Sequence, residues 1–202
     1  MNMKQTIVTL DLEGVLVPEI WIAVAEKTGL SELRRTTRDE PDYDKLMRGR
    51  LAILNREGLK LADIQKIIDG LRPLDGGRKF LDELRSLAPV MILSDTFEQF
   101  AQPLLRQLGW PALLCHRLVV EDGRIADYRI RLPDHKREAV AAFKRMNYKV
   151  LSVGDSFNDT SMLAEADTGF LFRAPENVKR AFPQFMKSEE YAHLLAAIKS
   201  LL

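Results

Sequence analysis

Three short apolar runs of the chain are each followed by side chains that could do chemistry. Asp11 and Glu13 follow the first run, residues 94–96 (Ser-Asp-Thr) follow the second, and residues 154–159 (Gly-Asp-Ser-Phe-Asn-Asp) follow the third. One acidic pair alone is as readily an acidic loop. The carboxyl ends of strands in a parallel sheet, however, meet at one edge, where such sheets bind ligands. We therefore expect carboxylates, a hydroxyl and an amide around one crevice.

Lys136 lies between the second and third of these segments and could bring an ammonium group to the same crevice. Such a set of groups suits a phosphate together with a hard cation. Oxygen ligands such as Asp11 and Asp155 are typical of Mg²⁺ sites. Two simpler interpretations stay open: Asp155 and Asn158 could cap a turn at a helix start, and Lys136 could be a solvated helix lysine.

The composition is that of an ordinary globular protein. The chain has 202 residues, of which 46% are apolar and 29% charged, which suits one domain with a modest insertion. Lys and Arg (30) nearly balance Asp and Glu (29), so no overall field favours nucleic acid or an anionic membrane. We expect a small-molecule partner, with no nucleic-acid partner and no membrane partner.

The amino terminus and the single cysteine indicate the compartment. The first apolar run is short and is broken by two acidic residues, unlike a signal peptide or a membrane-spanning helix. Cys115 cannot form an intrachain disulfide, which suits a reducing compartment; we expect a cytoplasmic protein with Cys115 in its core. The histidines match no metal template and are expected to be structural or solvated: His116, His135 and His193.

Apolar runs alternate with helical periodicity along the chain, which favours a parallel sheet layered by helices. The predicted strands cover residues 6–12, 89–93 and 149–153, with a hairpin over 117–130 that turns at 121–124. The predicted helices cover residues 18–29, 43–54, 61–68, 81–87, 97–108, 134–146 and 159–166. Residues 31–74 contain no convincing strand, so a helical insertion is expected after the first strand.

Individual residues refine these helix predictions. Pro18 is expected in the first turn of the first helix and Gly29 at its carboxyl end. Pro103 should bend the helix over 97–108 or place a boundary nearby. Asp134 is a candidate N-cap for the helix that carries Lys136 in its first turn.

The ordered segments resemble the haloacid dehalogenase (HAD) superfamily of phosphohydrolases, which carry four such motifs and a helical cap inserted after the first. Residues 11–21, 92–97 and 154–159 resemble more closely the phosphoserine phosphatase branch. Within it they resemble the bifunctional enzymes that combine phosphoserine phosphatase with phosphoserine:homoserine phosphotransferase activity. The similarity extends through the cap region to residues 174–178, and so covers nearly the whole chain.

The resemblance implies an α/β fold with a Rossmann-like parallel sheet and helices on both faces. It implies two units: residues 1–16 and 76–202 as the catalytic core, and residues 17–75 as a small helical cap that sets substrate specificity. The implied substrates are O-phospho-L-serine and L-homoserine, and the implied cofactor is Mg²⁺. A homo-oligomer is possible, and the sequence does not fix the oligomeric state.

The resemblance also assigns roles to the residues of the crevice. Asp11 would be the nucleophile that forms an aspartyl phosphate, Glu13 the acid and base, and Lys136 the group that stabilises transferring charge. Mg²⁺ would be held by Asp11, Asp155 and the backbone carbonyl of Glu13. Asp159 would orient Lys136 or a metal-bound water.

Substrate recognition follows the same resemblance. The groups expected around the phosphate are Ser94, Asp95 and Thr96 with their nearby backbone N–H groups, Lys136 and Asn158. Glu19 and Arg50 match the positions that meet the ammonium and carboxylate of phosphoserine. Two alternatives stay open: Glu19 could only complement a helix dipole, and Arg50 could be a solvated helix arginine.

The chain departs from most of the superfamily at Glu13, where other members have Asp. The extra methylene changes the reach of the carboxylic acid without changing its chemistry, and the resemblance suggests that the phosphotransferase branch uses Glu here. A phosphatase of another small phosphate ester is an open alternative. A receiver-like phosphoacceptor module is a second, which Glu13 and the helical insertion oppose. The sequence does not decide between water and homoserine as the preferred acceptor.

Overall fold

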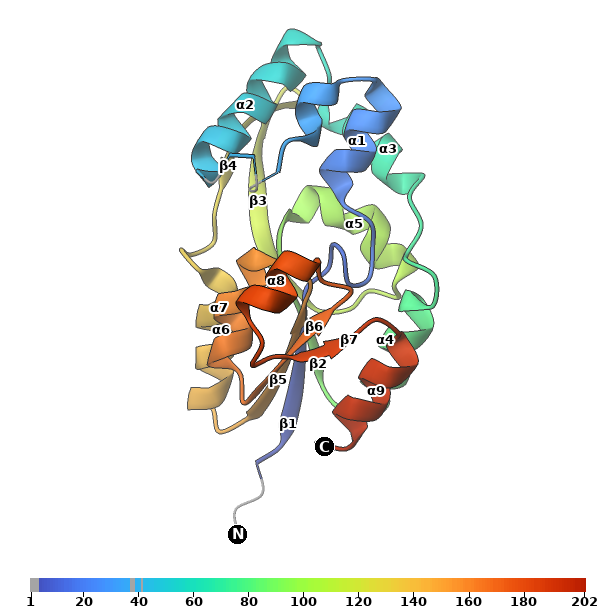
Figure 1. Cartoon of the computed structure of the whole chain (residues 1–202). Coiled ribbons are helices and arrows are strands. Elements are labelled where there is room, and N and C mark those ends of the chain that lie inside the picture. The colour runs from blue at the N-terminus through green and yellow to red at the C-terminus, as the bar shows by residue number, and fades with distance from the viewer. Residues whose placement is uncertain (1–3, 37–38, 41) are drawn as a thin grey trace.

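The computed structural model describes residues 4–36, 39–40 and 42–202. Its centre is a seven-stranded sheet in the order β4-β3-β2-β1-β5-β6-β7, drawn in Figure 1. The strands are β1 (Thr6–Leu10), β2 (Val90–Phe97), β3 (Leu113–Glu121), β4 (Arg124–Arg129), β5 (Lys149–Gly154), β6 (Thr168–Phe172) and β7 (Met186–Ser188). Neighbouring strands are parallel except β3 and β4, which form an antiparallel hairpin. The predicted α/β fold is confirmed.

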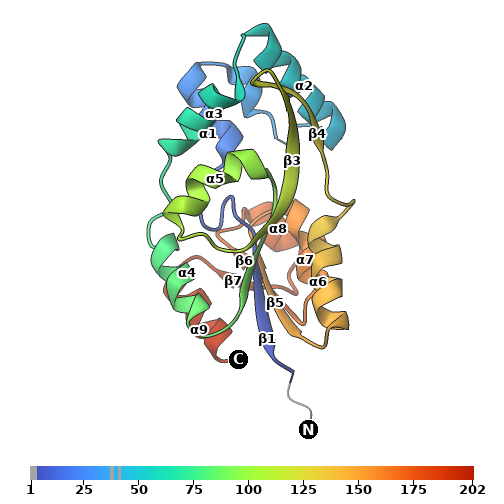
Figure 2. The ribbon, with the colours of Figure 1, turned by 180° about the vertical axis from the view of Figure 1, so that it is seen from behind.

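Helices cover both faces of the sheet and gather at the carboxyl end of β1. The helices are α1 (Ile20–Thr28), α2 (Tyr43–Arg56), α3 (Leu61–Asp69), α4 (Gly77–Arg85), α5 (Glu98–Gln107), α6 (His135–Arg145), α7 (Thr160–Glu165), α8 (Glu176–Ala181) and α9 (Tyr191–Lys199), with short 3₁₀ turns η1 (Ser31–Arg34) and η2 (Phe157–Asp159). Figures 1 and 2 show α4 and α9 on one side of the sheet, α6 and α7 on the other, and α1, α2 and α3 above its end. Among the described residues, no helix is long and apolar enough to cross a membrane.

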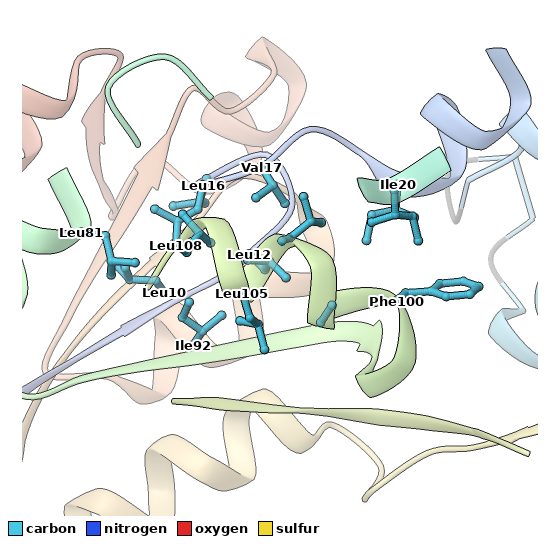
Figure 3. Packing of buried hydrophobic residues seen from close by; sticks show 14 of the residues in the cluster. Leu10, Leu12, Leu16, Val17, Ile20, Leu81, Ile92, Phe100, Leu105 and Leu108 are labelled. Carbon is cyan, nitrogen blue, oxygen red and sulfur yellow. The ribbon is translucent and has the colours of Figure 1, made fainter. Parts of the chain in front are cut away.

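Alternate residues of the central strands face two separate apolar clusters. Val8 and Leu10 of β1 belong to the larger cluster, which includes side chains of α4, α5 and α9, whereas Ile7 belongs to the smaller one, beneath α6, α7 and α8. Figure 3 shows Leu10 and Ile92 of the larger cluster packed near Leu105 of α5. This alternation is the two-residue period of a strand. Because helices cover both faces of the sheet, the strands are continuous apolar runs in the sequence.

The first strand and the first helix are shorter than the sequence predicts. β1 ends at Leu10, because the backbone then folds into a tight loop in which the Leu12 carbonyl accepts hydrogen bonds from the amides of Leu16 and Val17. Helix α1 begins only at Ile20, so the proline at position 18 precedes the helix instead of lying in its first turn. Both corrections lengthen the loop that carries the first acidic pair.

Pro103 lies inside α5, and no helix boundary is found there. Proline has no N–H to bond the carbonyl of Gln99 four residues earlier. That carbonyl instead accepts a hydrogen bond from the side-chain amide of Gln65, at 2.8 Å, on the neighbouring helix α3. The helix therefore continues because a tertiary contact supplies the donor that proline lacks.

The predicted hairpin is confirmed as β3 and β4, joined by Asp122 and Gly123. Both residues have positive φ, 49° and 77°, as a two-residue type I′ turn requires. The hairpin extends beside α2, as Figure 2 shows, where the hydroxyl of Tyr128 donates to the carboxylate of Asp44 at 2.6 Å. Helix α2 of the helical insertion is thus held by the hairpin as well as lying over the end of the sheet.

Candidate active site

The carboxyl ends of β1, β2 and β5 border a cavity of about 340 Å³ that α1 and α2 close from the opposite side. All but one of the residues that the sequence singles out for catalysis, substrate binding or metal binding line it: Asp11, Glu13, Glu19, Arg50, Ser94, Asp95, Thr96, Lys136, Asp155 and Asn158. The exception, Asp159, is fully buried against Lys136. The structure therefore brings the whole predicted set together, from segments far apart in the chain.

Lys136 is the buried cation of this site. Its ammonium lies 3.0 Å from Asp11 Oδ1, 2.8 Å from Asp159 Oδ1 and 3.1 Å from Asp95 Oδ2, with only 2% of its side chain exposed. Burial alone would lower the pKa of Lys136, but the charges of Asp11, Asp159 and Asp95 raise it well above its usual value. The interpretation of Lys136 as a solvated helix lysine is therefore wrong, and the ammonium stays charged.

Asp159 is fully committed to hydrogen bonds within the protein. One carboxylate oxygen binds Lys136, and the other accepts the backbone amides of Asp155 and Ser156 at 2.9 and 3.1 Å. Ser156 and Asp159 form a reciprocal capping box around η2. Gly154 makes this approach possible, since a Cβ there would collide with the Asp159 side chain. The turn is thus capped by Ser156 and Asp159, while Asp155 faces the cavity.

The acidic residues of the site are positioned to hold a metal ion. Carboxylate oxygens of Asp11, Asp155 and Asp159 lie within 4.8 Å of one another. Burial, and then repulsion from Asp159, raises the pKa of Asp11 well above its usual range and that of Asp155 to about 7. With Asp95 included, four carboxylates face the single ammonium of Lys136. A divalent cation would offset this excess of negative charge, and an all-oxygen donor set suits a hard one.

Gly14 allows Asp155 to approach the loop after β1. Its φ of 76° lies in the left-handed region, and a Cβ at this position would collide with the Asp155 carboxylate. Any side chain here would therefore be strained and would displace Asp155 from the end of β1. The glycine keeps the acidic residues of β1 and β5 close together.

Glu13 is held in place by the start of α1. Its Oε2 accepts a hydrogen bond from the backbone amide of Ile20 at 2.8 Å. Burial, and then the charge of Glu19, raises the pKa of Glu13 to about 8. A carboxyl group with this pKa is largely protonated at neutral pH and can give a proton to a leaving group in the cavity.

Arg50 of α2 is buried, with 8% of its surface exposed. Its guanidinium lies over the ring of Trp21 at 4.6 Å and donates from Nη2 to the carbonyl of Arg35 at 2.7 Å. Burial lowers the pKa of Arg50 to about 10, so the group stays charged at neutral pH. Among the residues that the structure describes, its buried Nε has no hydrogen-bond partner. The alternative of a solvated helix arginine is therefore wrong.

Glu19 lines the same cavity as Arg50, and its charge acts on Glu13, Asp155 and Arg50. It occupies the N-cap position of α1, is exposed to solvent and lines the cavity. A carboxylate and a guanidinium from two helices thus face the same space. They match the ammonium and carboxylate of an amino acid in charge.

Sequence reasoning missed three residues that contact Asp95. The hydroxyl of Tyr43, the first residue of α2, donates to the Asp95 carbonyl oxygen at 3.3 Å. His116 and His135 do not lie apart: their ring centroids are 4.4 Å from each other, and both rings face the Asp95 carboxylate. The only signal in the sequence was the position of His135 directly before Lys136.

Asp134 precedes α6 as predicted, but its side chain does not cap the helix. Its backbone is left-handed, with φ 48°. Its carboxylate instead accepts hydrogen bonds from Ser161 and Arg137, both at 2.7 Å. The left-handed turn directly precedes His135 and Lys136, which are both buried.

Comparisons with known proteins agree with this geometry. A family profile described as haloacid dehalogenase-like hydrolase matches residues 6–167. A phosphoserine phosphatase of Pseudomonas syringae pv. tomato is 61% identical over 180 residues, covering 89% of this chain and 76% of that protein. Phosphoserine phosphatase ThrH of Pseudomonas aeruginosa is 58% identical over 189 residues, covering 93% and 92%.

The fold is also found among solved structures. A phosphoserine phosphatase described as a phospho-aspartyl intermediate analogue has a TM-score of 0.79 at 20% identity, covering 96% of this chain and 99% of that one. A substrate-bound phosphoserine phosphatase has a TM-score of 0.76 at 21% identity, covering 94% and 95%. At this identity the likeness concerns the fold alone. Together with the family match over residues 6–167, these findings show that the chain belongs to the haloacid dehalogenase-like hydrolases.

Proposed function

We propose that this protein is a Mg²⁺-dependent phosphoserine phosphatase that also transfers the phosphoryl group to L-homoserine. One observation carries the proposal: a single cavity is lined both by carboxylates and an ammonium suited to phosphoryl transfer and by Glu19 and Arg50, whose charges are opposite to those of an amino acid. The names of the two Pseudomonas relatives support phosphoserine as the substrate. The assignment of homoserine as an acceptor rests on the resemblance of the motifs to the bifunctional enzymes.

In the first half-reaction, a carboxylate oxygen of Asp11 attacks phosphorus while the bond from phosphorus to the serine oxygen breaks. Asp11 Oδ1 receives hydrogen bonds from Lys136 and from the amide of Leu12, at 3.0 and 2.8 Å, which fix the carboxylate; we assign the attack to Oδ2. Glu13 donates its proton to the departing alkoxide. The products are serine and an aspartyl phosphate, so one hard displacement is divided into two easier ones.

In the second half-reaction, Glu13 takes a proton from the acceptor hydroxyl, whose oxygen attacks phosphorus and releases Asp11. The acceptor is water in the phosphatase reaction and homoserine in the transfer reaction. Serine and homoserine carry the same ammonium and carboxylate, so Glu19 and Arg50 can hold either one. The buried Nε of Arg50, which has no partner in the described part of the chain, would gain an acceptor from the substrate carboxylate.

The remaining residues bind the phosphate and the cation. Bound by Asp11, Asp155 and the backbone carbonyl of Glu13, Mg²⁺ would offset the repulsion between the carboxylate and the phosphate. Ser94, Thr96 and Asn158 are assigned to the phosphate oxygens. Residues 17–75 act as the cap in this proposal, since they carry both groups that meet the amino acid.

Phosphate release from O-phospho-L-serine tests the proposal. The assay contains Mg²⁺, with or without L-homoserine, and follows O-phosphohomoserine as well as phosphate, with EDTA as the control. Metal-dependent formation of both products supports the full proposal, and phosphate alone supports a phosphatase without the transfer activity. Inactivity toward phosphoserine, in a preparation that hydrolyses a generic phosphate ester, would discard the substrate assignment.

A further inference from the structure

We propose that His135 is a positioning residue of the phosphate site, with the His116 ring packed against it: the Nε2–H group of His135 holds one oxygen of Asp95, which keeps the other oxygen on Lys136 and Asn158. The inference rests on the proposed function of the cavity, because it adds a role within the same site. Neither histidine lines the cavity itself. His135 acts through Asp95.

The two oxygens of the Asp95 carboxylate have different partners. Oδ2 accepts a hydrogen bond from the Asn158 amide at 2.7 Å and lies 3.1 Å from the Lys136 ammonium. Oδ1 faces Nε2 of His135 at 3.1 Å and Nε2 of His116 at 3.6 Å. Asp95 therefore connects the end of β2 with a phosphate-binding amide after β5 and with the amine of α6. The imidazoles occupy the side of the carboxylate that does not face these two groups.

The protons on the rings favour hydrogen bonding over metal binding. By spacing alone, Asp95, His116 and His135 could hold an ion, since their ligand atoms lie within 4.8 Å of one another. Nδ1 of His116, however, accepts the backbone amide of Arg131 at 3.3 Å, which places the ring proton on Nε2. A metal bound at Nε2 would require the proton on Nδ1, where it would face the Arg131 N–H, donor against donor. The neutral ring instead turns its Nε2–H toward Asp95 Oδ1, which lies 3.6 Å away, beyond hydrogen-bond distance.

His116 is neutral at physiological pH, because burial and the neighbouring His135 lower its pKa to about 4. A neutral ring offers a single N–H, and the contact with Arg131 places that N–H on the side of the ring that faces Asp95 and His135. Asp95 remains the acceptor, because Lys136 and the hydrogen bonds from His135 and Asn158 outweigh the effect of burial and hold its pKa well below the usual range.

His135 is buried, and its ring contacts Asp95. Its Nδ1 is buried without a hydrogen-bond partner among the described residues, so Nε2 to Asp95 is the one polar contact that its ring makes there. The left-handed Asp134 directly precedes it, and both His135 and Lys136 are then buried, with 4% and 2% exposed. A left-handed non-glycine residue costs conformational energy that the surrounding contacts must offset. The backbone therefore aims two consecutive side chains at Asp95.

If the His135 donor is lost, the Asp95 carboxylate is free to turn. Its Oδ1 then lacks a buried donor. The carboxylate can regain one by rotating so that Oδ1 approaches Lys136, which breaks the hydrogen bond between Oδ2 and the Asn158 amide. Both groups belong to the proposed phosphate site, so binding of the phosphate should weaken. The loss of phosphate binding should be the same for any phosphate ester, because Glu19 and Arg50 are not involved.

His135→Leu and His135→Gln form the matched pair that tests this inference. The glutamine amide can replace the Nε2–H donor, and only the unpaired Nδ1 is lost. The affinity for inorganic phosphate is measured by calorimetry with Mg²⁺, beside kcat/KM for phosphoserine. We expect His135→Leu to weaken phosphate binding about tenfold, the size of one lost hydrogen bond to a charged group, and His135→Gln to bind nearly as well as the unaltered protein.

A double-mutant cycle with Asp95→Ala separates positioning from a general structural role. In the Asp95→Ala background, His135→Leu should weaken phosphate binding less than about twofold, because the group it holds is gone. Equal effects in both backgrounds, or a loss with His135→Gln as large as with His135→Leu, would overturn the inference. If His135→Leu does not fold, as judged by its thermal melting, the cycle is run with His135→Phe, which keeps a buried ring without a donor, and the same criteria.

The phosphate measurement also separates this inference from the proposed function. If the unaltered protein binds inorganic phosphate but does not turn over phosphoserine, the substrate assignment fails while the cycle still tests His135. If it binds no phosphate with Mg²⁺ present, the positioning role fails, because there is no phosphate site for Asp95 to order.

Discussion

Two groups of charged residues around the cavity, here named the sheet end and the cap end, differ in the contacts that they make within the protein. We define the sheet end by Asp11, Asp95, Lys136, Asp155 and Asp159. There, one ammonium contacts three carboxylates, and both oxygens of Asp159 already have partners within the chain. These contacts are made by the protein itself and do not wait for a substrate.

We define the cap end by Glu19, Trp21 and Arg50. The guanidinium rests on an aromatic ring and a backbone carbonyl, and its buried Nε lacks a partner among the described residues. Glu19 is exposed toward the cavity. Under the proposed function, the residues assigned to phosphate chemistry already have their contacts before substrate binds, whereas Arg50 would gain a partner from the substrate. Changes at the sheet end should therefore affect every phosphate ester, and changes at the cap end only those that carry an amino acid.

Asp11→Asn should have the largest effect. An amide oxygen is a far weaker nucleophile than a carboxylate, so kcat should fall by about 10⁴-fold or more with phosphoserine and with a generic phosphate ester alike. Steady-state kinetics on both substrates measures it, with thermal melting as the control for folding. If the purified variant turned over both substrates as fast as the unaltered protein, Asp11 would not be the nucleophile.

Lys136→Met should have the largest effect on stability. It removes the buried ammonium that contacts three carboxylates, which should lower the free energy of unfolding by about 3–5 kcal/mol in the absence of metal. Mg²⁺ should restore part of this loss, since it brings positive charge to the same carboxylates. Urea unfolding with and without Mg²⁺ measures both effects. An unchanged midpoint in the metal-free protein would show that the sheet end does not depend on its ammonium.

Arg50→Met should distinguish substrates. We expect KM for phosphoserine to rise about 10- to 100-fold, the size of a lost hydrogen-bonded charge pair, while phosphoethanolamine, which has no carboxylate, is turned over as before. Arg56→Met is the matched control, because Arg56 lies on the same helix with more than half of its side chain exposed and pairs with Glu32. If both substrates lose activity equally, the cap end does not select the amino acid.

The pH dependence of stability should be the smallest effect. In the metal-free protein, Asp155 and Glu13 have pKa values raised to about 7 and about 8 from usual values of 3.8 and 4.5. The folded state therefore holds protons that the unfolded state has released, so their contribution to stability is present at low pH and is lost as the pH rises through these values. In the proposed site Mg²⁺ would take the place of the proton on Asp155, so it should raise Tm more at pH 8 than at pH 6.

Calorimetry across this pH range, with and without Mg²⁺, measures the difference. Asp155→Asn should flatten the dependence, because the amide does not titrate. A Mg²⁺-dependent rise in Tm that is the same at both pH values would mean that the carboxylates of the site are already ionised without metal.

The positions of the site residues could be predicted because they depend on the order of strands. Asp11 and Asp155 each follow a strand, and the ends of parallel strands converge whatever the loops do. The predicted end of the second strand at residue 93 is wrong, because β2 continues through Ser94 to Phe97 with an irregular register against β3. The contacts among the site residues could not be predicted in the same way. His116 reaches Asp95 only because β3 runs beside β2 and because the ring is turned inward, and neither leaves a periodic signal in the sequence.

Residues that usually mark helix ends in a sequence did not do so where a tertiary contact took over their role. Pro103 did not end α5, because Gln65 of another helix satisfies the carbonyl of Gln99. Asp134 occupies the predicted N-cap position but is held by other side chains, since the chain must turn sharply to bury Lys136. The cytoplasmic location stays a prediction.

The central claim, that Asp11 accepts the phosphoryl group, is tested most directly by trapping the phosphorylated protein. The protein is mixed with phosphoserine carrying radioactive phosphorus, quenched in acid within the first turnover and digested into peptides. We predict label on the peptide that contains Asp11, loss of that label with hydroxylamine, and no label in Asp11→Asn. Phosphate release within the first turnover without labelled protein, or label on a different residue, would contradict the account.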